Sequence, residues 1–184
     1  LSGNGRTQNL ASAAQYTVLS GVKCWDCNSN SITAAAVGPT LPTSGFTYIA
    51  WARMKSSTAD WRTLFRTNPN DHPILIQTGT NNLGMYDNTA NAFYSASYDV
   101  SAFANVWAQW VVTGDSAGQT FYINGQQVGT VSGQTAAGNG HWYIGGITTT
   151  QNFGYVANTL LYTTKLTLEQ IQQNYYGLKG RFGV

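Results

Sequence analysis

Apolar and polar residues alternate most clearly over residues 105–131, where the pattern predicts three short strands. The runs at 106–113 and 120–123 are rich in β-branched and aromatic residues, and the polar cluster 114–118 separates them. Asn124 and Gly125 follow, and both tolerate the positive φ that a type I′ hairpin turn needs. Residues 126–131 then predict the returning strand. A meander of this kind cannot bury its apolar face alone, so we expect a second sheet.

Short apolar runs bounded by turn residues continue along the chain and predict an all-β protein. The run FTYIAWARM at 46–54 lacks strict alternation, so we expect it to be buried on much of both faces. The pattern is typical of an antiparallel two-sheet jelly-roll sandwich, and we place no boundary within residues 1–184. The further strands are expected at 16–22, 46–54, 61–66, 74–77, 83–86, 93–98, 141–144 and 153–162, with the breaker NPNDHP at 68–73.

One short C-terminal helix completes the predicted fold. Thr167 caps this helix, and Gln170 three residues later completes a capping-box pattern. We expect the helix to end at Gly177 or Gly180, because glycine commonly follows the last helical residue. The residues whose spacing predicts one helical face are Leu168, Ile171, Gln172, Tyr175 and Leu178.

Charged residues make up only 9% of the chain, against roughly 25% in an average soluble domain. This composition favours a virion surface or an extracellular setting. The nine Lys and Arg residues are scattered and the net charge is +2, so we expect no nucleic-acid partner. No apolar run approaches the roughly 20 residues of a membrane span. The chain begins with Leu1 and not Met, so we expect a processed product or part of a longer polypeptide.

Cys24 and Cys27 form a C-x-x-C pattern followed by the turn sequence NSNS. A thioredoxin-type site would need a strand before the motif and a helix after it, and a zinc site would need about four ligands. The only other candidate zinc ligands of the His and Cys types are His72 and His141, both distant in sequence. The sequence therefore predicts either a local disulfide or two packed thiols.

A calcium site is a second possibility in the same stretch. Asp26, Asn28 and Asn30 alternate within one turn, and hard cations prefer several carboxylate and carbonyl oxygens. The competing interpretation is a set of Asx turns, in which these side chains bond to their own backbone. One carboxylate is few for Ca²⁺, so the Asx interpretation is favoured and calcium stays open.

Four segments share the patterns of one domain family. They are LSGNGR at 1–6, FTYIAWARMK at 46–55, WAQWVVTGDSAGQTFYINGQQVG at 107–129 and FGYVANTLLYTTKLTLEQIQQNYYGLKGRF at 153–182. Together they resemble the laminin-G-like, concanavalin-A-like jelly rolls found in phage and viral structural proteins. LSGNGR lacks the Asp that precedes it in the family. The resemblance implies a two-sheet sandwich, a further N-terminal strand upstream, and a role in adhesion or assembly.

The same family includes retaining glycoside hydrolases, which need two carboxylates about 5–5.5 Å apart. This chain has one Glu, Glu169, within the predicted helix, and its six Asp residues lie mostly in predicted turns. Asp71 and His72 beside many serines could suggest a catalytic triad, but the nucleophile pattern G-x-S-x-G is absent. We therefore expect a protein that is not an enzyme.

The aromatic residues divide into core and surface candidates. Trp51, Trp107 and Trp110 lie inside predicted strands and are expected in the core. Aromatic residues also surround the Asn-rich loop 87–92, which we expect to be an adhesive tip held by the rigid sandwich. The predicted ligand-binding residues are Trp61, Asp71, His72, Tyr86, Asp87, Asn88, Asn91, Tyr94 and Trp142.

These patterns and the resemblance lead to one preferred hypothesis. We expect a non-catalytic structural or adhesion domain on a virus or phage particle, acting as a decoration, fibre or receptor-binding component. Its partners would be virion or cell-surface proteins or glycans, within an oligomeric assembly. An extracellular bacterial carbohydrate-binding module is the alternative, and a glycoside hydrolase ranks third.

Overall fold

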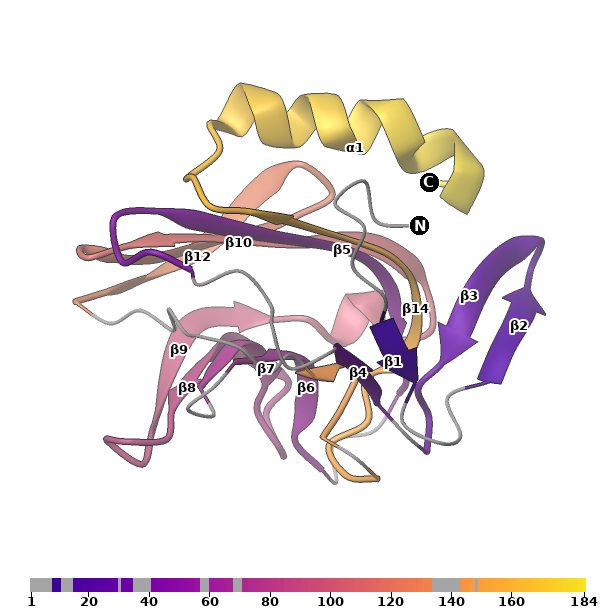
Figure 1. The fold of residues 1–184 in the computed structure, drawn as a ribbon, viewed down its shortest axis with the longest axis horizontal. Coiled ribbons are helices and arrows are strands. Elements are labelled where there is room, and N and C mark those ends of the chain that lie inside the picture. Colours follow the sequence, from indigo (N-terminus) through magenta and orange to yellow (C-terminus); the bar gives the residue numbers. More distant parts are fainter. Residues whose placement is uncertain are drawn as a thin grey trace.

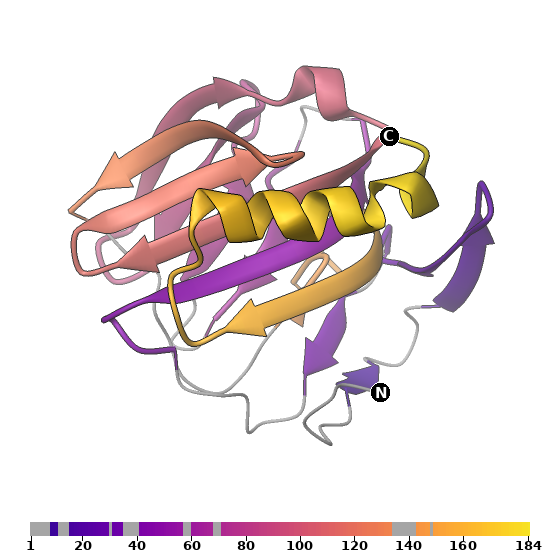
Figure 2. The same ribbon diagram turned by 90° about the horizontal axis from the view of Figure 1, so that it is seen from above.

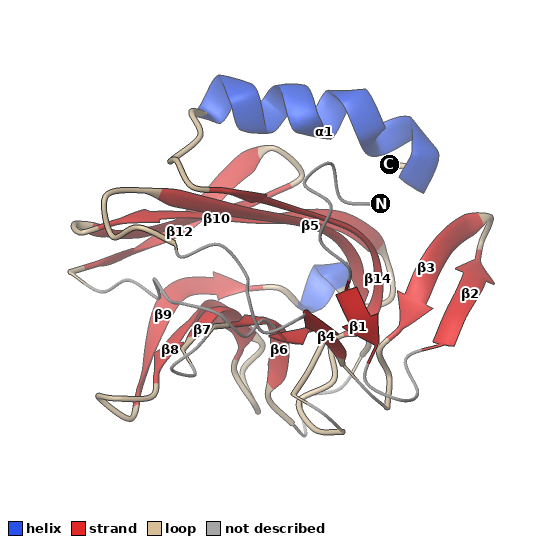
Figure 3. Cartoon of the chain, viewed as in Figure 1, coloured by secondary structure: helices blue, strands red, loops and turns tan. Residues whose placement is uncertain are grey.

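A computed structural model of the chain describes residues 8–10, 15–29, 31–34, 41–56, 60–67, 71–133, 143–147 and 149–184. The described elements are strands, apart from the helix α1 (Leu168–Phe182) and the short 3-10 helix η1 (Ser101–Phe103) (Figure 3). The strands form two sheets in which every described strand pair is antiparallel. The prediction of an all-β, antiparallel two-sheet sandwich with one C-terminal helix is confirmed.

Each sheet contains seven described strands. Sheet A has the spatial order β1 (Gln8–Leu10), β4 (Ile32–Ala34), β13 (Tyr143–Ile144), β6 (Arg62–Arg66), β7 (His72–Ile76), β8 (Asn82–Asp87), β9 (Ala92–Asp99). Sheet B has the order β12 (Gln126–Ser132), β11 (Gly118–Ile123), β10 (Trp107–Asp115), β5 (Phe46–Met54), β14 (Gly154–Tyr162), β3 (Val22–Asp26), β2 (Gln15–Leu19).

The main core lies between the two sheets, and α1 packs on the opposite face of sheet B (Figure 1). Strand β5 contributes to both layers because its side chains alternate across the sheet. Tyr48 and Ala50 belong to the core between the sheets, whereas Ile49 and Trp51 pack in the clusters that include α1 residues. The prediction that 46–54 is buried on both faces is confirmed, and the helix is the reason.

The expected meander forms the edge of sheet B. Asn124 and Gly125 have φ values of 51° and 75°, as the type I′ turn between β11 and β12 requires. The turn between β10 and β11 is shorter than the polar cluster 114–118 suggested, because Asp115 and Gly118 still pair across the strands. The Asp115 carboxylate closes it by accepting a hydrogen bond from the Ala117 N–H at 2.9 Å.

Helix α1 begins as predicted and ends later than predicted. The Thr167 hydroxyl and the Gln170 side chain form the reciprocal capping box. The helix continues to Phe182 and closes at Gly183 in the left-handed conformation, so the expected end at Gly177 or Gly180 is wrong. A helix tolerates an interior glycine at a cost of roughly 0.5–1 kcal/mol, which the burial of Phe182 offsets. Within the described residues no helix is long and apolar enough to cross a membrane.

Two strand predictions differ from the structure. The expected strand 16–22 is interrupted by a tight turn at Ser20 and Gly21, with φ values of 51° and 78°, and becomes the hairpin of β2 and β3. Strand β7 begins at His72 and includes Pro73, although the sequence predicted that residues 68–73 would separate two strands. A register shift between β7 and β8 from His72 to Leu75 accommodates the proline, which has no N–H to donate.

Candidate functional site

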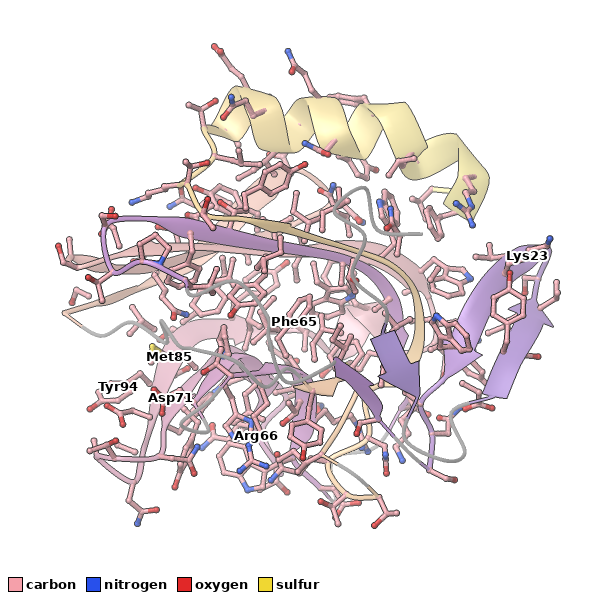
Figure 4. All side chains as sticks on the ribbon, viewed as in Figure 1. Lys23, Phe65, Arg66, Asp71, Met85 and Tyr94 are labelled. Atoms are coloured by element: carbon pink, nitrogen blue, oxygen red, sulfur yellow. The ribbon has the colours of Figure 1, made fainter. Side chains whose placement is uncertain are left out.

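The outer faces of the two sheets differ in what covers them. Helix α1 lies along the outer face of sheet B, over β5 and β10 (Figures 1 and 2). No described helix lies on the outer face of sheet A. Neighbouring side chains on β6 show how this sheet divides: Phe65 lies between the sheets and Arg66 lies on the outer side (Figure 4). The outer face of sheet A is therefore the larger surface on which to look for a binding site.

Four ring side chains gather on this face, and we call Trp61, His72, Tyr86 and Phe93 the aromatic patch. The strand register pairs Tyr86 of β8 with His72 of β7 and with Phe93 of β9. The ring centroids of Trp61 lie 5.9 Å from Tyr86 and 5.3 Å from Phe93, both edge to face. His72 and Tyr86 are 6.0 Å apart in the same arrangement. Each edge-to-face contact contributes roughly 0.5–1.5 kcal/mol beyond area burial.

Gly84 on β8 makes room for the ring of Phe93. A Cβ at position 84 would lie 2.6 Å from the Phe93 Cζ and 2.3 Å from the Tyr94 carbonyl oxygen. Real Cβ atoms do not approach other atoms this closely, so any side chain at Gly84 would displace the ring or the strand. The absence of a side chain at Gly84 thus leaves the space that the Phe93 ring occupies beside Trp61.

Polar groups border the patch where β7 and β8 begin and end. The Asp71 carboxylate accepts a hydrogen bond from the Asn88 N–H at 2.9 Å, which ties the β8–β9 turn to β7. Asp87 accepts hydrogen bonds from the Thr89 and Ala90 N–H groups and shapes that turn. Burial raises the pKa of Asp71, the Asn88 N–H opposes this, and Asp87 raises it further. Asp71, just before β7, and Asp87, at the end of β8, therefore both bind backbone N–H groups of the β8–β9 turn.

The Tyr86 hydroxyl joins the patch to the same turn. It donates a hydrogen bond of 2.7 Å to the Asn91 Oδ1. Asn91 adopts a φ of 51°, a left-handed conformation that Asn tolerates better than most residues. Tyr86 therefore offers a fixed aromatic ring with its hydroxyl already oriented.

His72 is held as a neutral side chain. Its Nδ1 lies 2.9 Å from the Thr63 hydroxyl, and that hydroxyl donates to the Gln151 Oε1 at 2.7 Å. Because the single hydroxyl proton goes to Gln151, Nδ1 carries the ring proton and donates to Thr63. Burial, with a smaller effect of the Arg66 charge, lowers the pKa of His72 to about 3. His72 is thus an uncharged structural member of the face at neutral pH.

Arg66 and Tyr143 extend the face beyond the patch. They are register partners on β6 and β13, and the guanidinium lies 5.8 Å from the Tyr143 ring centroid. Burial lowers the pKa of Arg66 from its usual value, and the guanidinium is still fully charged at neutral pH. Among the described residues, the outer face of sheet A therefore combines aromatic rings, carboxylates and the Arg66 cation.

The structure gathers most of the predicted ligand-binding residues and separates one. Tyr94 pairs with Met85, and both lie toward the main core, so Tyr94 belongs to the opposite face from Tyr86. Trp142 lies outside the described residues. The predicted residues that meet around the patch and its turn are Trp61, Asp71, His72, Tyr86, Asp87, Asn88 and Asn91.

Three further residues belong to this site and were not among the predicted ligand-binding residues, although Phe93 is one of the aromatic residues around the loop 87–92. Phe93 completes the ring cluster, and alternation along β9 could have placed it opposite Tyr94. Thr63 and Gln151 fix the His72 ring but lie 88 residues apart in sequence. No local signal connects such residues.

The C-x-x-C motif does not form a disulfide in the structure. Cys24 and Cys27 are both free and buried. Cys24 packs with Trp51 and Phe182 under α1, whereas Cys27 lies in the main core between the sheets. The two thiols thus pack on opposite faces of sheet B. The disulfide alternative is replaced by the packed-thiol one.

The proposed calcium turn contains an Asx interaction. The Asp26 Oδ1 accepts hydrogen bonds from the Asn28 backbone N–H at 2.9 Å and from its Nδ2 at 2.7 Å. Asn30 lies outside the described residues. In the part of the chain that the structure describes, no three His, Cys, Asp or Glu side chains group closely enough to hold a metal ion.

The carboxylates expected of a hydrolase are not arranged as a catalytic pair on one strand. Glu169 is exposed on α1, on the far side of sheet B from the aromatic patch. The imidazole of His72 bonds to Thr63 and not to Asp71, whose carboxylate binds the Asn88 N–H. Asp71 and His72, which the sequence analysis weighed and rejected as part of a catalytic triad, therefore bind different partners.

A profile of the concanavalin A-like lectin/glucanases superfamily, of the laminin G type, matches residues 26–172. The chain belongs to this superfamily. The match spans strands of both sheets and the beginning of α1, so the family assignment and the observed sandwich agree. A search of curated protein sequences gave no match.

Several solved structures share this fold at low sequence identity. The binding domain of Paraclostridial Mosquitocidal Protein 1 superposes with a TM-score of 0.71 at 19% identity, over 96% of this chain and 48% of that one. The ligand binding domain of botulinum neurotoxin serotype D, in complex with N-acetylneuraminic acid, gives 0.72 at 13% identity, over 95% and 47%. The serotype G binding domain gives 0.62 at 18%, over 95% and 47%. This chain therefore spans about half the length of each.

Proposed function

We propose that this chain is a non-catalytic carbohydrate-binding domain that uses the outer face of sheet A. The observation that carries the proposal is the aromatic patch of Trp61, His72, Tyr86 and Phe93, on a sheet face that no described helix covers. The outer face of sheet B, in contrast, is covered by α1. A fixed aromatic cluster on an otherwise polar surface is the usual composition of a recognition site.

The chemistry of the patch suits a sugar ring. The apolar C–H face of a pyranose can rest on Trp61 or Tyr86, while the ring hydroxyls reach the carboxylates and amides beside them. Asp71 and Asn91 supply oxygen acceptors at this edge. The patch needs little reorganisation on binding, because strand register and hydrogen bonds already hold its side chains, and preorganisation favours affinity.

Arg66 supports an acidic sugar as the first ligand to test. Its charged guanidinium lies on the same face and lowers the pKa of His72 through its charge. The solved serotype D domain was crystallised with N-acetylneuraminic acid, which is an acidic sugar. The chain spans only about half of that structure, so we use the ligand as a probe.

We further propose that the domain is displayed on a virus or phage particle, where it docks onto host glycans or neighbouring proteins. The low charge and the resemblance of the closing segment to phage fibre domains support this setting. An extracellular bacterial carbohydrate-binding module would use the same patch. Association with purified virions and a fixed oligomer in light scattering would favour the particle role, whereas a monomer absent from particles would contradict it.

The binding proposal is tested by a glycan array followed by titration with N-acetylneuraminic acid and with the best array hit. Trp61→Ala removes the ring that contacts two others, and we expect at least about a 10-fold loss of affinity, as for a central aromatic anchor. Tyr176→Ala is the matched control, because Tyr176 is an exposed aromatic on α1, on the other side of the molecule. Equal affinities of the two variants, or no binding by the wild-type chain to any glycan, would refute the proposal.

A further inference from the structure

A group of buried polar atoms on the outer face of sheet B finds no hydrogen-bond partner among the described residues. The atoms are the Nε1 of Trp51, the Nε1 of Trp107, and both the Oε1 and the Nε2 of Gln109. The exposed fractions of these residues are 1%, 7% and 0%. Trp51 and Trp107 belong to the cluster that packs against Phe182 of α1.

Strand register brings these three side chains together. Gln109 on β10 is the direct partner of Trp51 on β5, so their side chains share one face. Trp107 precedes Gln109 by two positions and lies on the same face of β10. Two indole groups and one carboxamide, which can both donate and accept, thus share one face of sheet B.

The second half of α1 covers this group with aromatic rings. Phe182 stacks on Trp51 with centroids 4.1 Å apart and planes 3° apart, and Tyr175 stacks on Trp51 at 5.8 Å. Phe182 also contacts Trp107 at 5.4 Å. The ring faces offer the indole N–H groups at most weak N–H···π contacts, and none of the four polar atoms has a conventional hydrogen-bond partner among the described residues.

Leaving these atoms unpaired would weaken the fold greatly. A single buried group without a partner lowers the folding equilibrium constant by roughly 5- to 150-fold. A hydroxyl group solves the problem, because its oxygen accepts from an indole N–H and its proton donates to the Gln109 Oε1. We propose that Trp51, Trp107 and Gln109 form a second binding site, for hydroxyl groups, between sheet B and α1.

The hydroxyl can come from two sources. Water enters such a polar site with α1 docked, as buried water commonly does. A sugar ring would instead take the position of Phe182 on the indole of Trp51, which requires the second half of α1 to move away. Gly177 and Gly180 lie in that half, and a Cβ at either position would meet nothing within 4 Å. Packing does not require these glycines, and they weaken the helix where it covers the site.

The first experiment detects the hydroxyl by NMR on the full chain, through magnetisation transfer from water to the indole Nε1–H resonances. We expect cross-peaks at Trp51 and Trp107. Trp110 is the internal control, because its Nε1 donates to the Ala52 carbonyl at 3.1 Å and should give none. Gln109→Met keeps the side-chain length and removes both polar atoms, so it should abolish the cross-peaks and lower the folding equilibrium constant. Absent water contacts, with a more stable Gln109→Met variant, would overturn the proposal.

The second experiment distinguishes the sources with lactose and N-acetylneuraminic acid as probes. A sugar source predicts that either probe shifts the Trp51 and Trp107 indole resonances. The double variant Gly177→Ala, Gly180→Ala should then bind about 5- to 30-fold more weakly, because it strengthens the helix that must open. If the hydroxyl belongs to water, neither probe should shift the two indole resonances, and the cross-peaks to water should remain. Trp61→Ala impairs only the aromatic patch on sheet A. Comparing this variant with the sheet B variants therefore shows which of the two proposed sites is absent.

Discussion

The packing of Phe182 gives a sharp test of how the C-terminal helix is held. Phe182 is 5% exposed and its ring lies against both Trp51 and Trp107. Phe→Ala substitutions in cores cost about 3–5 kcal/mol. Because the last turn of α1 can relax after the change, we expect the lower end, about 3 kcal/mol of unfolding free energy.

The measurement is urea unfolding followed by circular dichroism, with thermal unfolding as a second readout. A loss of about 3 kcal/mol lowers the Tm by roughly 6–12 °C for a chain of this size. Tyr176→Ala is the control, because Tyr176 is 60% exposed on the same helix and should change the free energy by about 0.5 kcal/mol or less. If Phe182→Ala behaved like Tyr176→Ala, the last turn would not be docked on sheet B and the packing argument would fail.

Three further predictions concern single side chains. The pKa of His72 is about 6.5 in the unfolded chain and about 3 in the folded chain, so protonation of His72 favours unfolding. As the pH is lowered from 6.5 to 3, the free energy of unfolding should therefore fall by up to about 1.4 kcal/mol per pH unit. His72→Gln should lack this part of the loss in acid-titrated unfolding. Burial raises the pKa of the Cys24 and Cys27 thiols, so neither should react with a thiol reagent at neutral pH until the chain unfolds. Both thiols are free, and a mass gain of two hydrogens on reduction would contradict this by revealing a disulfide. The Asp26 carboxylate is already bonded by Asn28, so EDTA should leave the Tm unchanged, and a lower Tm would indicate a metal.

Local signals in the sequence account for the elements that were predicted well. Thr167 and Gln170 form a capping box because both partners lie within one helical turn. Asn124 and Gly125 form their turn because each tolerates positive φ by its own covalent structure. Ser20 and Gly21 make the same kind of turn, and the Ser-Gly pair was a signal that could have divided the expected strand 16–22.

The candidate site was only partly predictable, because its residues meet through strand pairing. The Asn-rich turn at 87–92 marked one end of it, and Tyr86 and Asn91 do interact there. Trp61 reaches the same place from before β6, and no spacing in the sequence relates it to Phe93. The side to which Tyr94 points likewise depends on the register of β8 with β9.

The sequence by itself determined the fold class, the capped start of the helix, the Asn-Gly hairpin and the burial of Trp51, because these follow from backbone preferences and the spacing of apolar residues. Only the tertiary structure decided which faces are covered. It sent Cys24 toward α1 and Cys27 toward the main core, extended the helix to Phe182, and brought the aromatic patch together on sheet A. The physical reason is that register and helix docking are set by contacts between residues far apart in the chain, whose free energies appear only when the sheets pack.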